Sequence, residues 1–119
     1  MKLEVTSKGD RLDSTLDPRF GRAAYILIVD TKTLEYEVLD NNKNKNSFTG
    51  AGIQTAAMVN NHEAEVLLTG FIGPAAFKTL EAAGVKVVYN QSGRVINVVQ
   101  TFKQGNVVFA DTANKGKYW

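Results

Sequence analysis

The sequence predicts an α/β fold, with one mixed five-stranded sheet flanked by helices. Three observations predict it. The chain has 119 residues, 44% of them hydrophobic, which is enough for the core of one domain. Short β-rich apolar runs dominate as far as Asp40, and from Gly50 onward helical spacing alternates with such runs. The resulting order, β-β-β-α-β-α-β-α, is a meander followed by βαβ units, which favours a single sheet.

The first half is expected to hold three strands. KLEVTS (2–7) alternates between apolar and polar residues, and AYILIVD (24–30) is almost wholly apolar, as in a strand covered on both faces. The segment 8–22 between them carries the Gly, Asp and Pro residues typical of a loop. EYEVLD (35–40) should form an antiparallel hairpin with 24–30. The Asn/Lys patch NNKNKN (41–46) predicts a solvated loop.

In the second half, apolar residues recur at helical spacing in three segments. The first of these helices is expected to bury Ile53, Ala56 and Ala57. The later helices show a proline in the first turn or a glycine as a stop signal. The expected elements are a helix from Gly50, a strand at 65–70, a helix at 73–84, a strand at 85–89 and a helix at 93–105. Residues 106–119 are expected to form a short strand or turn and then a loose tail.

Our preferred topology is the ribonuclease H-like arrangement, with strand order 3-2-1-4-5 and the second strand antiparallel. In that arrangement, the loops 8–22 and 41–52 and the loops after the fourth and fifth strands meet at one edge of the sheet. All three helices also begin there. Ligands of open α/β sheets usually bind outside the carboxyl ends of the strands, so this edge is the expected ligand site.

Glycines stand where helices begin at this edge. Gly50-Ala51-Gly52 opens the first helix, and Gly70 and Gly73 flank the start of the second. Glycine lets backbone N–H groups approach a ligand closely, and a helix N-terminus favours an anion. The same glycines have a purely structural interpretation as helix caps. The six-residue dinucleotide fingerprint is missing, so NAD is not expected.

Two arginines in the motif RFGR add positive charge at this edge. Arg19 and Arg22 carry planar guanidinium groups that stay charged at any physiological pH. They can complete an anion site, or they can pair locally with Asp13 or Asp17. The only histidine, His62, lacks obvious partners for a metal site, and we interpret it as a polar residue at a helix end.

Composition excludes several classes of protein. The 14 basic and 12 acidic residues give a net charge of +2, too balanced for a nucleic-acid-binding protein. The absence of cysteine excludes disulfides and thiolate-held metal centres. No run of apolar residues suits a signal peptide or a membrane helix. We therefore expect a single cytoplasmic domain over 1–119 that contacts neither nucleic acid nor membrane.

Taken together, these motifs resemble the dinitrogenase iron–molybdenum cofactor-binding family. The matching pieces are LDSTLDPRFGRAAYILIVD, GAGIQTA, TGFIGPAAF and AAGVKV, in the family's order and spacing over about residues 2–105. The resemblance implies a ribonuclease H-like fold and the carriage, storage or insertion of a metal–sulfur cofactor, without catalysis. Family members include nitrogenase cofactor carriers and the orange proteins of sulfate-reducing bacteria, which hold a molybdenum–copper–sulfide cluster. This chain looks like the stand-alone type.

The resemblance also implies a set of cofactor-binding residues. They are Arg19, Phe20, Gly21, Arg22, Gly50, Ala51, Gly52, Thr69, Gly70 and Gly73. It assigns no catalytic residue and no protein ligand to a metal, since cysteine is lacking and His62 matches no ligand position. A molybdenum–sulfur cluster, of the Mo–Cu sulfide or iron–molybdenum cofactor type, brings its own sulfides and negative charge. Guanidinium groups and backbone N–H donors can hold it, with delivery and recipient proteins as partners.

Two other functions compete with cluster carriage for this sequence. A ribonuclease H-like nuclease needs several carboxylates at the sheet centre to bind two metal ions, and the first strand offers only Glu4. Nuclease activity is therefore not expected. The other rival is an anion- or nucleotide-sensing module, or a protein-interaction module, that uses the same loops. Colour or molybdenum content of the purified protein would separate this alternative from a cluster carrier.

Overall fold

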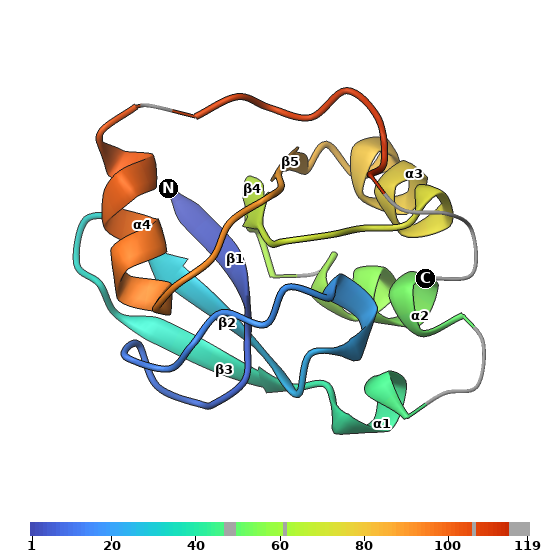
Figure 1. Ribbon diagram of the computed structural model, residues 1–119, viewed down its shortest axis with the longest axis horizontal. Helices are drawn as coiled ribbons and strands as arrows, with labels where there is room; N and C mark the ends of the chain where they lie inside the picture. Colours follow the sequence, from blue (N-terminus) through green and yellow to red (C-terminus); the bar gives the residue numbers. More distant parts are fainter. Residues whose placement is uncertain (47–49, 61, 106, 115–119) are drawn as a thin grey trace.

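The computed structural model describes residues 1–46, 50–60, 62–105 and 107–114, which form one five-stranded sheet with helices on both faces (Figure 1). The strand order is β3-β2-β1-β4-β5, and the predicted order 3-2-1-4-5 is confirmed. The strands are β1 (Lys2–Ser7), β2 (Tyr25–Asp30), β3 (Tyr36–Asp40), β4 (Val66–Leu68) and β5 (Lys86–Val88). The helices are α1 (Asn42–Lys45), α2 (Ala51–Val59), α3 (Pro74–Ala82) and α4 (Val95–Lys103), with a 3₁₀ turn η1 at Phe20–Arg22.

Strand β2 lies between β1 and β3 and is antiparallel to both, as predicted. Its residues 26–29 are all buried, in keeping with the continuous apolar run in the sequence. Strands β4 and β5 run parallel to β1. The carboxyl ends of β1, β4 and β5 therefore point to the edge where the chain enters β2, which brings the predicted loops together.

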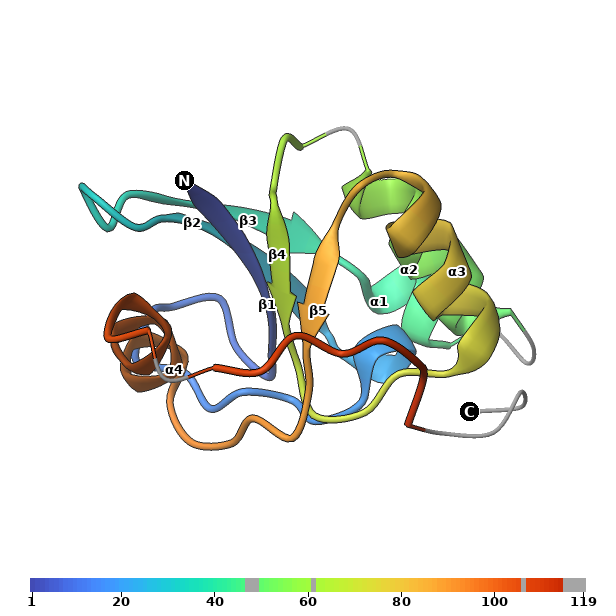
Figure 2. The same ribbon diagram turned by 90° about the horizontal axis from the view of Figure 1, so that it is seen from above.

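The two faces of the sheet bury different cores. Helices α2 and α3 cover one face and α4 covers the other (Figure 2). Successive side chains of a strand point to opposite faces. In β1, Leu3 and Val5 accordingly pack toward α4, whereas Glu4 pairs across the sheet with Ile28 and Leu67, which belong to the core under α2 and α3.

Three local expectations were wrong. The Asn/Lys patch is not a solvated loop: its first residue, Asn41, is fully buried, and α1 follows it. Helix α2 buries Ala51, Thr55, Ala56 and Val59, while Ile53 is 48% exposed and Ala57 is exposed. Its buried face is therefore rotated from the one predicted.

The third wrong expectation concerns the C-terminal segment. Residues 107–114 lie along the edge of β5 and reach the start of α3 (Figures 1 and 2). The N–H of Ala110 donates to the carbonyl of Val87 at 2.7 Å. This part of the expected loose tail is thus attached to the sheet, and the rest of that tail falls outside the described residues.

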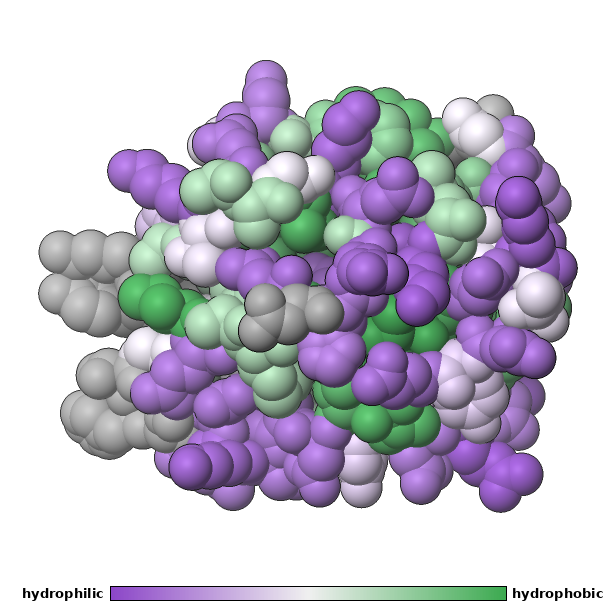
Figure 3. Space-filling view, turned by 180° about the vertical axis from the view of Figure 1, so that it is seen from behind, coloured by the Kyte–Doolittle hydropathy of each residue, from purple (hydrophilic) through white to green (hydrophobic). Residues whose placement is uncertain are grey.

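Polar side chains cover most of the face opposite to the view of Figure 1, and apolar ones gather in smaller areas between them (Figure 3). The large apolar side chains with substantial exposure in the described residues are Met1, Tyr36, Val38, Ile53, Val108 and Phe109. Among the described residues, no helix has the length and apolarity required to cross a bilayer.

Candidate functional site

The candidate site lies at the carboxyl edge of the sheet, where η1 meets the loop that follows β4. The N–H of Phe71 donates to the carbonyl of Pro18 at 2.6 Å, and the N–H of Phe20 donates to the carbonyl of Phe71 at 3.1 Å. These bonds form a short parallel bridge between Arg19 and Phe71. The segment that carries RFGR is thereby attached to the TGFIG loop, although the two are far apart in the sequence.

Two glycines allow backbones to touch at this junction. A Cβ atom on Gly21 would lie 2.6 Å from the backbone nitrogen of Gly52, and one on Gly70 would lie 2.6 Å from the Cβ of Pro18. Gly52 in turn packs against α3, since a Cβ there would lie 3.2 Å from the Cβ of Ala76. Segment 18–22, the start of α2 and the start of α3 therefore meet within van der Waals contact.

The starts of α2 and α3 present backbone donors. The first N–H groups of a helix have no partner within the helix. Within the described residues no side chain caps either helix, and the N-cap residues are Gly50 and Gly73. Gly50 has a φ of 75°, a left-handed conformation that suits glycine. Both helix dipoles therefore favour negative charge at this edge.

Helix α4 starts at the same edge, but its donors are already used. The N–H groups of Val95 and Ile96 donate to the carbonyls of Ser14 and Leu12, at 2.9 and 2.8 Å. The loop 8–17 thus closes the start of α4. Among the described residues, no bond of this kind is found at the starts of α2 and α3.

The arginines occupy different surroundings. Arg19 is exposed, and its Nε lies 3.7 Å from Oδ1 of Asp17, a carboxyl group that is 8% exposed and also accepts the backbone N–H of Arg19. The structural alternative, local pairing with Asp17, is therefore present for Arg19. The half-buried Arg22 donates from Nη1 to the carbonyl of Lys45 at 2.7 Å, a neutral acceptor at the end of α1. Asp13 pairs with Arg11 instead.

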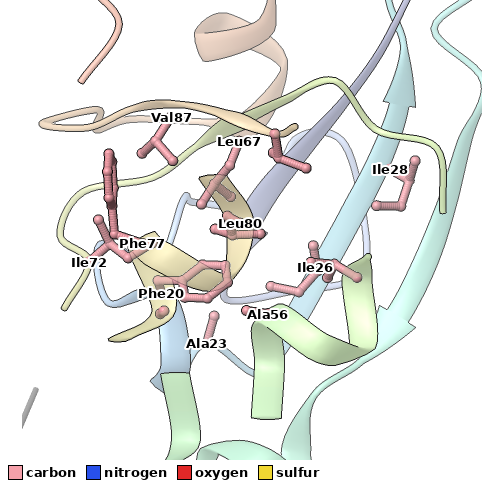
Figure 4. Packing of buried hydrophobic residues seen from close by; sticks show 13 residues of the cluster. Phe20, Ala23, Ile26, Ile28, Ala56, Leu67, Ile72, Phe77, Leu80 and Val87 are labelled. Carbon is pink, nitrogen blue, oxygen red and sulfur yellow. The ribbon is translucent and has the colours of Figure 1, made fainter. Parts of the chain in front are cut away.

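Three predicted site residues are buried and can offer only backbone atoms. The ring of Phe20 is 1% exposed and lies in the core near Ala23 and Leu80 (Figure 4). Ala51 is 3% exposed. The hydroxyl of Thr69 is buried against that of Thr6 at 2.9 Å. The predicted positions do gather at one edge, but the side chains available at its surface come from Arg19 and Arg22.

The site has no set of metal-ligating side chains in the part of the chain that the structure describes. No group of three or more His, Cys, Asp or Glu residues is found there that could hold a metal ion. Glu4, the one carboxylate of β1, is fully buried, and within the described residues neither carboxyl oxygen has a hydrogen-bond partner. Burial raises the pKa of Glu4 to about 8, so it is mostly neutral at pH 7.

Sequence reasoning missed Asn41, which positions two helices of the site. Its side-chain amide donates to the carbonyl of Ala23 at 2.8 Å, and its carbonyl oxygen accepts bonds from Asn44 and from the hydroxyl of Thr55. These contacts join α1 and α2 to the chain just after η1. The low-complexity pattern around Asn41 gave no signal, because its neighbours in sequence have the same composition.

The arrangement as a whole suits an anion with several acceptor atoms. It combines two uncapped helix starts, a glycine-lined backbone junction and two guanidinium groups at one edge. It offers no nucleophile with an adjacent base and no cluster of metal-ligating side chains among the described residues.

Comparisons with known proteins identify relatives of the same architecture. The apo form of the orange protein from Desulfovibrio gigas superposes with a TM-score of 0.92 at 43% identity, covering 96% of each chain. A Thermotoga protein solved by NMR and described as a candidate NifB protein gives a TM-score of 0.82 at 31% identity, covering 96% of this chain and 97% of its own. An uncharacterized protein of Methanocaldococcus jannaschii is 24% identical over 98 residues, 80% of this chain and 82% of the relative.

The family relationship rests on nearly the full length of the chain. The family model described as dinitrogenase iron-molybdenum cofactor matches residues 1–105, which include every predicted site residue. The two solved relatives at 43% and 31% identity share the fold over the same length. The chain therefore belongs to the dinitrogenase iron-molybdenum cofactor family.

Proposed function

We propose that this protein is a non-catalytic carrier of an anionic metal–sulfur cluster, bound at the carboxyl edge of the sheet. The observation that carries the proposal is the junction of Gly21 with Gly52, beside two helix starts that no side chain caps. Backbone N–H groups that converge in this way bind multiply charged anions without any protein ligand to a metal. Membership of the family and the likeness to the orange protein support the choice of a molybdenum-containing cluster.

The residues fit a cluster that brings its own sulfides. The chain has no cysteine, and the described residues contain no group of metal-ligating side chains. A thiomolybdate or a Mo–Cu sulfide cluster has sulfur acceptors and negative charge on its surface, so N–H and guanidinium donors suffice. Arg19 and Arg22 supply the charge, and the starts of α2 and α3 supply N–H donors. Phe71, which is half-buried, and Ile53, which is exposed, supply apolar surface nearby.

A carrier implies exchange with other proteins. A cluster held by hydrogen bonds and charge alone can leave without the breaking of a metal–protein bond. Delivery and recipient proteins are therefore the partners we propose, with the cytoplasm as the compartment. The alternative, an anion- or nucleotide-sensing module, uses the same donors but predicts a preference for phosphate groups over sulfide clusters.

The test is reconstitution of the apo protein with tetrathiomolybdate and copper, followed by desalting and visible absorbance. Wild type is compared with Arg19→Ala/Arg22→Ala and Arg19→Lys/Arg22→Lys. Each lost contact costs about 1.5–3 kcal/mol, so the alanine pair should bind about a hundredfold more weakly or worse. The lysine pair should recover part of the binding, because a point charge cannot reproduce the planar fork.

The matched control is Lys32→Ala/Lys103→Ala, which removes two exposed positive charges at a β-turn and at the end of α4. It should retain the cluster as wild type does. Equal retention in the wild type and both arginine variants would reject the role of the arginines. Failure of wild type to retain any cluster, together with tight binding of a nucleotide or inorganic phosphate, would favour the sensing module.

A further inference from the structure

One side chain outside the family-matching region reaches the loop of the candidate site. The family model ends at residue 105, and Asn114 lies beyond it. The Nδ2 of Asn114 donates to the carbonyl of Gly70 at 3.0 Å, and its Oδ1 accepts the N–H of Ile72 at 2.8 Å. The backbone N–H of Asn114 also donates to the carbonyl of Ile72 at 3.2 Å. Three hydrogen bonds thus join one residue to two positions of the loop.

These bonds complete a clamp on the loop between β4 and α3. On one side, segment 18–20 holds Phe71 through both its N–H and its carbonyl group. Asn114 holds the residues before and after Phe71, and the N–H of Asn90 adds a second bond to the carbonyl of Gly70 at 2.8 Å. Because Ile72 is followed directly by Gly73, the N-cap of α3, the clamp fixes where the first N–H groups of α3 point.

The side chain of Asn114 is suited to this task by its chemistry. An amide has one donor and one acceptor group side by side, and it can therefore satisfy the carbonyl of Gly70 and the N–H of Ile72 together. An aspartate would keep the acceptor but lose the donor, and its charge would lie close to a site meant for an anion. An alanine would release the N–H of Ile72 and leave the carbonyl of Gly70 with the N–H of Asn90 as its remaining donor.

We propose that Asn114 is a positioning residue for the anion site, which couples attachment of segment 107–114 to ligand binding. The part of this inference that concerns ligand binding rests on the proposed function. A loop held in place loses less conformational freedom when the anion binds, so the clamp raises affinity without touching the ligand. Coupling of this kind is reciprocal: the bound anion must strengthen the attachment of Asn114 by the same factor.

The experiment titrates apo protein with tetrathiomolybdate alone, for wild type, Asn114→Ala, Asn114→Asp and the control Asn97→Ala, which alters an exposed amide on α4. We expect Asn114→Ala to bind about tenfold more weakly, in line with the loss of loop hydrogen bonds. Asn114→Asp should bind more weakly still, and Asn97→Ala should match wild type. Equal affinity for all four folded proteins overturns the proposal.

Amide exchange separates this inference from the proposed function. In apo protein, the Ile72 N–H should exchange faster in Asn114→Ala than in wild type, whether or not the anion binds. In wild type, tetrathiomolybdate should slow exchange of the Asn114 N–H. If wild type binds no thiomolybdate, the proposed function and the coupling both fail. If Ile72 exchanges at the same rate in both proteins, the clamp itself is refuted even when wild type binds.

Discussion

Glu4 shows how one residue can set the pH dependence of this fold. Its carboxyl group is fully buried, without a hydrogen-bond partner among the described residues, between Ile28 and Leu67 of the neighbouring strands. Burial disfavours the charged form and raises the pKa of Glu4 from 4.5 to about 8. At pH values between 4.5 and about 8, Glu4 therefore keeps its proton in the folded state, whereas the unfolded chain has lost it.

The sign of the effect follows from the raised pKa. Between pH 4.5 and about 8 the folded state binds more protons than the unfolded state, so the free energy of unfolding falls as pH rises. At about 1.4 kcal/mol for each unit of pKa difference, the total fall is on the order of 3–5 kcal/mol. We predict that Glu4→Gln, which stays neutral, removes this fall. Urea unfolding at pH 5, 6.5 and 8 gives the free energy of unfolding of wild type and Glu4→Gln. If this free energy fell equally with pH in both proteins, the prediction would be wrong.

At the scale of residues, the sequence predicted a site but could not assign the surroundings of its side chains. The motif RFGR drew attention to Arg19 and Arg22, because permanent charges beside a buried strand are unusual, and their role in binding stays a prediction. It could not show that Phe20 points into the core, since a loop has no periodicity that assigns a side chain to one face. Asn114 was unpredictable for a related reason: its partners, Gly70 and Ile72, are brought to it only by the folded chain.

At the scale of elements, the contact of η1 with α2 depends on the absence of a side chain at Gly21. An added Cβ would lie 2.6 Å from a backbone nitrogen, which cannot move without displacing the helix. We predict that Gly21→Ala lowers the free energy of unfolding by about 1–3 kcal/mol and also abolishes cluster retention.

The matched control for this variant is Gly84→Ala. Gly84 has a φ of 80° and open space around it, so alanine there costs about 1–2 kcal/mol through backbone strain alone. The two variants should lose similar stability, but only Gly21→Ala should lose the cluster. Retention of the cluster by folded Gly21→Ala would show that the junction is not part of the site.

Asn41 connects α1 and α2 to the chain after η1, and its loss should loosen all three. We predict that Asn41→Ala lowers the free energy of unfolding by about 1–3 kcal/mol, because it leaves the buried carbonyl of Ala23 without its side-chain donor, while the hydroxyl of Thr55 keeps the carbonyl of Ala51 as acceptor. The neighbouring Asn42→Ala removes only an exposed bond to Asp40 and should cost less than about 1 kcal/mol. Chemical denaturation measures the free energy of unfolding of both variants. An equal loss in the two would mean that Asn41 contributes no more to stability than Asn42.

The same buried amide explains why the face of α2 was predicted wrongly. Periodicity assigns apolar residues to the buried side, which places Ile53 inward. In the structure Thr55 is inward instead, because its hydroxyl is satisfied by Asn41 and by the carbonyl of Ala51. Ala56 is inward as well, which keeps the helix close to the sheet. Helices α3 and α4 do bury apolar residues at the predicted spacing, among them Leu80 and Val98. Strand β1, by contrast, also buries the polar Glu4 and Thr6.

At the scale of the whole molecule, the topology was predictable because few arrangements of a meander and two βαβ units are allowed. Convergence of the loops followed from strand direction. What strand direction could not reveal is that loop 8–17 closes the start of α4, through backbone bonds from Val95 and Ile96. The same loop leads directly into Pro18 and η1. It therefore links the face covered by α4 to a site built on the opposite side.

This link predicts that ligand binding is felt on both faces. A domain of this size usually unfolds in one cooperative step, and a ligand that binds only the folded state stabilises it by about 2.7 kcal/mol at one hundred times its dissociation constant. Saturation with tetrathiomolybdate and copper should then slow global amide exchange in Val98 and Val99 of α4 as much as in Ala56 of α2, although α4 lies on the opposite face of the sheet from α2. Arg19→Ala/Arg22→Ala should lose the protection at all three positions. Protection confined to Ala56 would mean that the two faces open independently, and that the bonds between loop 8–17 and α4 transmit nothing from the site.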